Sequence, residues 1–475
     1  MNSRKLSTNK MRMIYVGIDW LTTFIAFFAF DVCRFHIFQG ESPYFVNLSQ
    51  YLLMPKLILE QIFIPTGLLG IYWLSGFYNH PIDKSRVHEL IVTFNTAIFN
   101  AILLFFLLLI DDRGPIASTD YTMIAASFLL LFVFTYVGRF AVTNLMRSYV
   151  LRHQLQYNVL IIGSSSNASQ VRKTLIHSSR AMKYNIVGFV KLPGENVNGH
   201  TDKFRDLESI EEICRNENVD QIILAPESKE DDVVLNLLDR LFPLDIPIKI
   251  MPDTLSYITS SIRLTDILGE PFIDLTSSPL SEFSMNVKLS IDKLVSALVL
   301  VVISPLMIAL MIGVKKSSHG RIFYRQERIG LKQKPFYIYK FRSMYEDAER
   351  NGPMLSSEND PRITPIGRLM RKYRLDELPQ FWNVLKGDMS LVGPRPEREY
   401  YIRKIIQKAP YYALVFQVRP GITSWGMVKF GYASDIKQMV ERTKFDLIYI
   451  TNMSLALDIK IIIYTFRTII KGSGM

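Results

Sequence analysis

The sequence predicts a membrane protein in three parts: four transmembrane α-helices, a Rossmann-like α/β domain, and an α-rich C-terminal domain with a re-entrant membrane helix hairpin. Apolar residues make up 49% of the 475 residues and the mean hydropathy is +0.15, which is high for a soluble protein. Four long apolar stretches fill residues 1–150. Short apolar strands alternate with helical segments through residues 151–280, and a basic domain follows at 281–475.

The four apolar stretches are each close to the ~20 residues that cross a bilayer. They are placed at Met13–Phe30, Leu57–Phe77, Leu90–Ile110 and Tyr121–Val137. Cations flank the block at both ends, namely Arg4, Lys5, Lys10 and Arg12 before it and Arg139, Arg147 and Arg152 after it. The third connection instead carries Asp111, Asp112 and Asp120. Because basic segments stay in the cytoplasm, both ends of the block are predicted to face the cytoplasm.

Residues 151–280 are predicted to form a parallel, doubly wound α/β sheet. Its strands are placed at Asn158–Ile162, Tyr184–Val190, Asp220–Ala225 and Ile246–Ile250. The turn after the first strand is similar to a dinucleotide-binding fingerprint, but Ser165 and Ala168 replace its second and third glycines. Lys191 follows the second strand, where an acidic residue would hold a ribose. We therefore favour a structural, oligomerising or regulatory module over a nucleotide-binding one.

Charge is unevenly distributed along the chain, whose formal net charge is +11. Residues 281–475 contain 31 Lys and Arg against 17 Asp and Glu, and residues 1–280 contain 24 against 27. The basic C-terminal part predicts an anionic partner, either a phosphorylated substrate or an anionic lipid surface. No zinc-finger spacing or RNA-binding signature accompanies it, so nucleic acid is not an expected partner. Two distant cysteines exclude a disulfide framework and fit a cytosol-facing protein.

The uncharged run Leu294–Val314 is long enough to cross a membrane, but two features favour a hairpin over residues 288–316. Lysines lie on both sides of the run, so both of its ends are predicted to stay cytoplasmic. Ser304 and Pro305 lie near its middle, where proline breaks the helix and the serine hydroxyl satisfies a freed backbone group. The alternative is an ordinary fifth span, which would place the basic domain outside the cell.

The adjacent carboxylates Asp376 and Glu377 are the candidate catalytic residues and the candidate ligands of Mg²⁺. Guanidinium and ammonium groups grip phosphate oxygens, so the candidate phosphate-binding residues are Lys340, Arg342, Arg371, Arg395 and Arg419. Helical spacing places Arg371 about 140° from Asp376, which ranks Arg395 above it. The competing interpretation is one amphipathic helix with Leu375, Leu378, Phe381, Trp382 and Leu385 inward and solvated charges outward.

Further motifs accompany this pair in a fixed order: Tyr324–Gly330, Lys340–Met344, Asn359–Thr364, Gly393–Pro396, Arg419–Thr423 and Lys444–Asp446. Together with Lys288–Asp292 and the Ser304-Pro305 bend, the region from Met285 to Lys471 resembles the bacterial sugar transferase family, the polyprenyl-phosphate hexose-1-phosphate transferases. The whole chain looks like the long form of that family, with four N-terminal transmembrane helices. Two motifs depart from the family pattern: Ser318–Arg321 replaces Pro-Gly-Pro, and Lys429–Tyr432 replaces a segment with Asn-Gly-Arg.

The resemblance implies a reaction and its partners. Asp376 is the implied nucleophile on the β-phosphorus of a UDP-sugar, UMP is released, and undecaprenyl phosphate accepts the sugar phosphate in a second step. Mg²⁺ is the implied cofactor, with Glu377 helping to bind it or orienting the nucleophile. The implied location is the bacterial inner membrane with the catalytic domain facing the cytoplasm, and the implied role is to initiate exopolysaccharide, capsule or O-antigen synthesis. A homodimer through the middle domain is a further expectation.

Two other functions remain open at this point. A membrane-anchored NAD-dependent nucleotide-sugar dehydratase or epimerase needs a Tyr-x-x-x-Lys pair, and Tyr400 and Lys404 supply one far from the glycine turn. A non-catalytic membrane scaffold would keep an inactive transferase domain, which the intact carboxylate pair argues against. The sequence does not specify which sugar is transferred.

Overall fold

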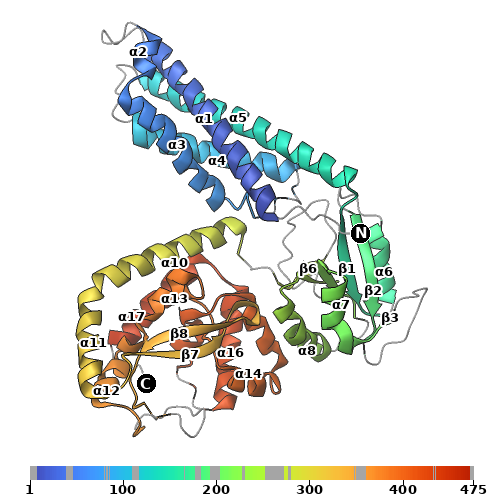
Figure 1. Ribbon diagram of the computed structural model, residues 1–475, viewed down its shortest axis with the longest axis vertical. Coiled ribbons are helices and arrows are strands. Elements are labelled where there is room, and N and C mark those ends of the chain that lie inside the picture. The colour runs from blue at the N-terminus through green and yellow to red at the C-terminus, as the bar shows by residue number, and fades with distance from the viewer. Residues whose placement is uncertain are drawn as a thin grey trace. The chain divides into compact units, whose positions relative to one another are not determined.

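The computed structural model describes residues 8–38, 47–79, 81, 84, 86–109, 117–164, 166–176, 183–192, 204–226, 231–251, 272–276, 280–346, 348, 360–431, 433 and 435–470. Figure 1 follows these residues along the chain. The chain divides into two compact units, one running to Gln156 and the other holding most of the chain from Tyr157 onward. The acidic third connection at 111–116, Ser165 and Asn359 lie outside the described residues.

The first unit contains α1 (Thr8–Phe38), α2 (Leu48–Leu52), α3 (Pro55–Leu74), α4 (Arg86–Leu104) with a π-helical turn η1 (Phe105–Leu109), and α5 (Ala117–Arg152). Four of these helical segments, 9–37, 55–74, 86–108 and 121–152, are long and apolar enough to cross a membrane. They confirm the four predicted stretches and fit a membrane protein. Large apolar side chains point outward from them, including Phe63 and Leu129, as expected of helices solvated by lipid.

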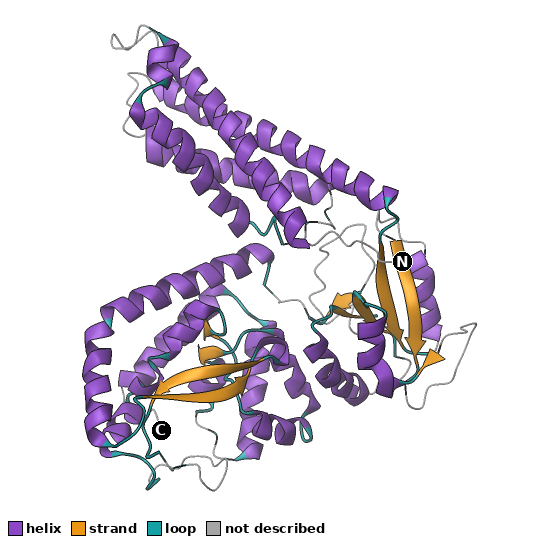
Figure 2. Cartoon of the chain, viewed as in Figure 1, coloured by secondary structure: helices purple, strands orange, loops and turns teal. Residues whose placement is uncertain are grey.

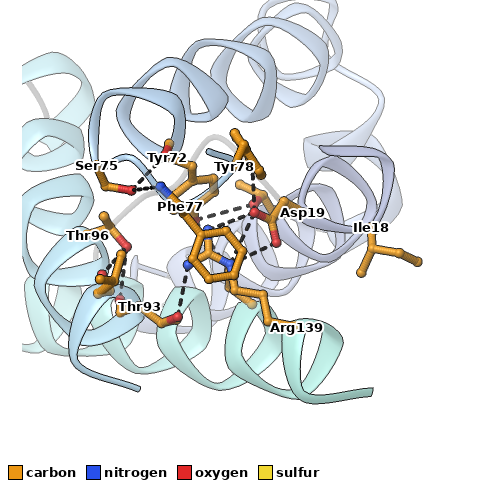
Figure 3. Close-up of polar contacts among 12 residues, drawn as sticks. Ile18, Asp19, Tyr72, Ser75, Phe77, Tyr78, Thr93, Thr96 and Arg139 are labelled. Carbon is orange, nitrogen blue, oxygen red and sulfur yellow. Dashed lines mark hydrogen bonds and ion pairs between the residues drawn. The ribbon is translucent and has the colours of Figure 1, made fainter. Parts of the chain in front are cut away.

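A buried ion pair joins the helices of this unit, as Figure 3 shows. The Arg139 guanidinium of α5 is fully buried and donates from Nη2 to Oδ2 of Asp19 on α1 at 2.7 Å. Tyr78 donates to the same Asp19 oxygen at 2.7 Å, and Arg139 Nη1 donates to Thr93 Oγ1 on α4 at 2.9 Å. The charge pattern of the sequence groups Arg139 with the flanking cations, whereas the structure buries it. Its hydrogen bonds offset the free-energy cost of burying the charge, since buried charges must be paired.

The α/β part of the second unit is a six-stranded mixed sheet. In order across the sheet, the strands are β3 (Phe204–Arg205), β2 (Lys183–Val190), β1 (Gln156–Ile162), β4 (Gln221–Leu224), β5 (Ile248–Ile250) and β6 (Ile273–Asp274). The pairs β1–β4, β4–β5 and β2–β3 are parallel, and β5–β6 is antiparallel. The four predicted strands are confirmed, but the expectation of a wholly parallel sheet is wrong because a two-residue edge strand returns in the opposite direction.

Helices cover both faces of this sheet. Alternate residues of β1 separate into two cores: Leu160 and Ile162 pack with α7 (Ile210–Asn216) and α8 (Asp231–Leu241), while Val159 and Ile161 pack with α6 (Ser166–Ile176). Burial on both faces explains why β1 and β4 appear in the sequence as uninterrupted apolar runs instead of alternating patterns.

The rest of the second unit begins with two helices joined at a sharp bend. α10 (Glu282–Val302) and α11 (Ser304–Ser317) meet at 63°, and Ser304 Oγ donates to the Val301 carbonyl at 2.8 Å. The bend therefore lies at the predicted Ser304-Pro305 position, and Pro305 occupies the first turn of α11, where it is tolerated. Leu294 and Val301, each 72% exposed, are part of a large apolar surface on this helix pair.

A β-hairpin and six α-helices follow in the described part of the chain. Figure 2 distinguishes the helices from the strands by colour. The hairpin consists of β7 (Phe323–Ile329), the short turn η4 (Leu331–Gln333) and β8 (Pro335–Phe341). The helices are α12 (Pro365–Lys372), α13 (Gln380–Lys386), α14 (Glu399–Ile406), α15 (Trp425–Lys429), α16 (Ile436–Thr451) and α17 (Leu455–Ile470). This part of the chain also contains two 3₁₀ segments, η5 (Leu375–Glu377) and η6 (Pro410–Gln417). It contains one parallel strand pair, β9 (Ser390–Val392) with β10 (Gly421–Thr423). The domain is α-rich as predicted, and the hairpin is an addition to that prediction.

Candidate active site

Asp376 and Glu377 lie on a 3₁₀ turn between two helices. α12 ends at Lys372, and Arg374 adopts the left-handed conformation, with φ 54° and ψ 26°, directly before η5. α13 begins only at Gln380. The interpretation of this stretch as one amphipathic helix is therefore wrong, and Trp382 is 54% exposed instead of inward. The predicted angle of about 140° between Arg371 and Asp376 is also wrong, because the left-handed residue Arg374 interrupts the helix between them.

Three cations surround the Glu377 carboxylate. Lys340 Nζ of β8 donates to its Oε1 at 2.7 Å, and Arg395 Nη2 approaches the same oxygen at 3.4 Å. Arg374 Nη1 lies 3.5 Å from Oε2. Burial alone would raise the pKa of Glu377, but Lys340, Arg395 and Arg374 outweigh it and hold that pKa well below its usual value. Glu377 is therefore a permanently ionised anchor for cations.

Asp376 is equally buried but differently placed. No described side chain donates a hydrogen bond to its carboxylate or forms an ion pair with it. The Asp376 backbone amide and the charges of Lys340 and Arg371 nevertheless favour its ionised form. Burial, with the neighbouring Glu377 charge, raises the pKa of Asp376 above the usual value for an aspartate. The pKa values of the two adjacent carboxylates are thus shifted in opposite directions.

Lys340 contacts Glu377 and acts electrostatically on both carboxylates. Burial lowers its pKa, Glu377 opposes that fall, and the nearby Arg395 charge adds to it. Lys340 remains the closest cation to the pair, and its position follows from β8, whose residue 340 faces Tyr324 in the antiparallel register.

The structure gathers some of the predicted phosphate-binding residues and not others. The Glu377 carboxylate is contacted by Lys340 and Arg395. The charge of Arg371 acts on Asp376, and Arg371 Nε also donates to Ser343 Oγ at 2.9 Å. Arg419 Nε donates to the Gly387 carbonyl at 3.0 Å, on the turn after α13. Arg342 is buried away from the pair and donates to the carbonyls of Ser318 and His319, at 2.7 and 2.6 Å.

Arg342 thereby fixes the exit from α11, where the sequence lacks the expected Pro-Gly-Pro. Gly320 has a φ of +119°, and a side-chain atom there would meet the Arg342 guanidinium at 2.0 Å. We infer that guanidinium hydrogen bonds hold the turn that two prolines would otherwise stiffen.

Residues outside the predicted set of site residues complete the site. Arg374 contributes both a cation and the left-handed break, and Ser343 holds Arg371. Arg395 Nη1 contacts Met427 Sδ at 3.2 Å. No sequence pattern predicts a left-handed arginine, because φ > 0 is common only for glycine and asparagine.

The predicted Mg²⁺ can be tested against the donor set. Magnesium is usually held by one or two carboxylates together with substrate phosphates and water, not by an all-protein cage. Asp376 and Glu377 are two such carboxylates, and the described residues contain no group of three acidic, histidine or cysteine side chains placed to hold a metal ion. The two carboxylates are compatible with a magnesium site that substrate and water would complete.

Other predicted features lie outside this site. Tyr400 and Lys404 sit on α14, where Lys404 Nζ donates to the Tyr400 hydroxyl at 2.6 Å in an exposed position. In the mixed sheet, Gly163 has a φ of +138° and lies against the Ala225 carbonyl, and Asn167 Nδ2 donates to the Pro226 carbonyl at 2.7 Å. These described residues of the glycine turn therefore join β1 to the end of β4.

Comparison with protein families identifies two regions of the chain. The bacterial sugar transferase model matches residues 283–472, and a model described as a CoA-binding domain matches residues 74–252. Every residue of the carboxylate pair and its surrounding cations falls in the first region.

Individual relatives agree with the first match. The chain is 38% identical over 254 residues to the UDP-N-acetylgalactosamine-undecaprenyl-phosphate N-acetylgalactosaminephosphotransferase of Aeromonas hydrophila, covering 53% of this chain and 59% of that protein. It is 34% identical over 269 residues to the UDP-glucose:undecaprenyl-phosphate glucose-1-phosphate transferase of Escherichia coli K12, covering 56% and 57%. An uncharacterized sugar transferase of Bacillus subtilis is 41% identical over 154 residues, which is 72% of its length. The chain thus spans less than two thirds of the first two relatives.

Proposed function

The chain belongs to the bacterial sugar transferase family, and we propose that it moves a hexose-1-phosphate from a UDP-sugar to undecaprenyl phosphate. The observation that carries the proposal is the asymmetry of the carboxylate pair: Glu377 is held by three cations, and Asp376 forms no ion pair and accepts no side-chain hydrogen bond among the described residues. Relatives with UDP-sugar and undecaprenyl phosphate in their names support the substrates.

In the proposed first step, an Asp376 carboxylate oxygen attacks the β-phosphorus of the UDP-sugar. A bond forms between that oxygen and the phosphorus, the bond to the bridging oxygen breaks, and UMP leaves with the electron pair. In the second step, a phosphate oxygen of undecaprenyl phosphate attacks the same phosphorus. The aspartate carboxylate is released, and the sugar is left on the lipid through a diphosphate.

Lys340 and Arg395 are proposed to hold the donor diphosphate while Arg371 stabilises charge on Asp376. Phosphoryl transfer depends mainly on positioning and on charge stabilisation. The contacts of Lys340 and Arg395 with Glu377, and the effect of the Arg371 charge on Asp376, support these roles. Bound Mg²⁺ would neutralise charge on the diphosphate, and Asp376 with Glu377 would supply its protein ligands. Arg419 and Arg342 are proposed to support the site from the 387 turn and the 318–319 turn.

The α10–α11 pair is proposed to enter one leaflet as a re-entrant hairpin and return to the cytoplasm. The 63° bend, the exposed apolar surface and the lysines at both ends support this topology. It would keep the catalytic domain, 281–475, on the cytoplasmic side of the bacterial inner membrane, where nucleotide-sugars are found. The preceding parts are proposed to be a four-helix membrane domain, 1–150, and a Rossmann-like module, 151–280, through which the protein forms a homodimer.

The test is UMP release by detergent-purified protein with Mg²⁺, undecaprenyl phosphate and a panel of UDP-sugars. We expect release with a specific sugar, dependence on the lipid for turnover, and loss of at least about a thousandfold in Asp376→Asn. Asp388→Asn is the matched control, because Asp388 lies on the same segment but pairs with Lys386 at the surface. Retained activity in Asp376→Asn, with the control also active, would reject Asp376 as the nucleophile.

A further inference from the structure

The tip of the β7–β8 hairpin is bound by the mixed sheet part of the same unit. Asp245, just after α8, accepts ion pairs from both Lys332 and Lys334, the latter at 2.6 Å. Between them, Gln333 Nε2 donates to the carbonyl and to Oδ1 of Asp239, at 3.0 and 2.9 Å. Three consecutive side chains of the tip therefore contact two acidic residues of the module.

The backbone on both sides of this contact has an uncommon conformation. Lys332, Gln333 and Asp245 have φ values of 55°, 56° and 57°. Non-glycine residues rarely occupy the left-handed region, and two in succession at a hairpin tip need outside support. The ion pairs and the amide hydrogen bonds supply that support, so the shape of the tip depends on its contact with the module.

A second contact joins the same two parts next to the hairpin tip. Ala413 of η6 is fully buried in the core of the mixed sheet, together with Leu237 and Leu241 of α8. Its neighbours Tyr412 and Phe416 are buried in the transferase part instead. The 3₁₀ segment thus spans both cores, and the contact with the module is a packed one and not merely a charged surface.

Both strands of the hairpin lead from this contact to the carboxylate pair. β8 runs from the tip to Lys340, which donates to Glu377. On β7, the Ile329 amide donates to the Glu397 carbonyl at 3.1 Å, and Arg328 Nη1 donates to the Pro396 carbonyl at 3.1 Å.

These bonds fix the segment that carries Arg395, the second cation on Glu377. A small cavity there is lined by residues of the hairpin tip, of the Arg395 segment and of η6, namely Ile329, Gly330, Pro394, Arg395, Tyr412 and Phe416. The lining shows that the hairpin tip, the segment of Arg395 and η6 meet around this cavity, next to Arg395.

We propose that Asp245 of the α/β module is a positioning residue for the transfer reaction, acting through Lys332 and Lys334 on the placement of Lys340 and Arg395. The module would then be required for efficient turnover although it contributes no group to the reacting atoms. This inference rests on the proposed function, because its main readout is UMP release.

The test is a charge exchange in the full-length protein. Asp245→Lys turns both ion pairs into repulsions, and the triple variant Asp245→Lys, Lys332→Asp, Lys334→Asp restores attraction with the signs reversed. We expect kcat for UMP release to fall about tenfold in the single variant, the scale on which a few exposed ion pairs act. The KM for the UDP-sugar should change little, and the triple variant should regain most of the wild-type kcat. Glu211→Lys is the matched control, since Glu211 pairs with Arg240 within the module at similar exposure.

A second readout separates this inference from the proposed function. Hydrogen exchange of the β8 amides, 336–341, should be faster in Asp245→Lys and return toward wild type in the triple variant, whether or not UMP is released. If the wild-type protein released no UMP but Asp245→Lys still exchanged faster, the contact would be supported and the proposed function rejected. Wild-type kcat and wild-type exchange in Asp245→Lys would overturn the inference, as would an equal fall in Glu211→Lys or a failure of the triple variant to recover.

Discussion

At the scale of single residues, two chemically similar carboxylates next to each other in the chain have been given different roles by their surroundings. Glu377 receives three cations and Asp376 receives none directly. The consequence is a buried charge on Asp376 that the described residues do not fully compensate, and this is the type of cost that functional sites retain.

That cost predicts a stability effect. Because the pKa of Asp376 is raised in the folded protein, its favourable contribution is present below the pKa of the unfolded chain and is lost as the pH rises through the folded value. At pH 7.5, Asp376→Asn should therefore have a higher melting temperature than wild type. The expected increase is about 2–4 °C for each kcal/mol that the substitution adds to the free energy of unfolding. The difference should shrink as the pH falls and Asp376 takes up a proton.

The measurement is thermal unfolding followed by tryptophan fluorescence, at pH 7.5 and at mildly acidic pH. Asp388→Asn is again the control, because it removes a surface ion pair and should leave the melting temperature nearly unchanged. A lower melting temperature for Asp376→Asn at pH 7.5 would contradict the assigned direction of the pKa.

At the scale of elements, the bend between α10 and α11 decides whether a continuous apolar run crosses the membrane or turns back. The two helices are separated by Ile303 alone, and Ser304 Oγ satisfies the Val301 carbonyl at the break. Pro305 cannot donate a backbone hydrogen bond into the preceding helix, so the break is encoded at that residue.

Pro305→Ala should therefore allow α10 and α11 to merge into one straighter helix in a fraction of molecules. Because a straight helix of this length can cross the bilayer, part of the population should place its transferase domain on the opposite side. The measurement is labelling of a cysteine introduced at Ser317 with an impermeant reagent in sealed inverted vesicles. We expect partial loss of cytoplasmic labelling and a parallel loss of UMP release.

Pro65→Ala is the matched control, since Pro65 lies inside α3, a helix long and apolar enough to span the membrane. Topology in that variant should match wild type. Unchanged labelling in Pro305→Ala would show that the lysines at the two ends suffice to keep the hairpin re-entrant without the proline.

At the scale of the whole molecule, the buried ion pair of the membrane bundle and the carboxylate pair belong to different compact units. Asp19 and Arg139 are both fully buried, and their interactions are with residues of the first unit. Stability of the bundle and chemistry of the transferase part should therefore be separable.

Asp19→Asn should destabilise the protein by about 3–5 kcal/mol, because it leaves the Arg139 charge buried with its main partner removed. Detergent stability and yield should drop, while UMP release per folded molecule should stay near wild type. Lys56→Gln is the control, since its ion pair with Glu60 in the same unit involves a lysine that is 79% exposed. A loss of turnover in folded Asp19→Asn protein would indicate that the membrane bundle takes part in the reaction.

The sequence alone determined the parts that depend on local patterns. Run length and cation placement predicted the four membrane helices, apolar strands predicted β1, β2, β4 and β5, and Ser304-Pro305 predicted the bend. The adjacent carboxylates and the ordered motifs indicated the family, because chemistry that needs particular residue types leaves them visible in the chain.

Only the tertiary structure decided how those residues divide the work. Lys340 lies near the end of β8 and Arg342 directly follows that strand. Arg342 nevertheless donates to a carbonyl at the exit of α11, whereas Lys340 donates to Glu377. The left-handed Arg374, the burial of Arg139 and the contact of Asp245 with the hairpin tip were equally hidden. The burial of Arg139 and the contact of Asp245 depend on partners distant in sequence, and a pattern of neighbouring residues carries no information about which distant groups share a charge or a hydrogen bond. Arg374 pairs with the nearby Glu377, but its left-handed conformation is not encoded by residue type.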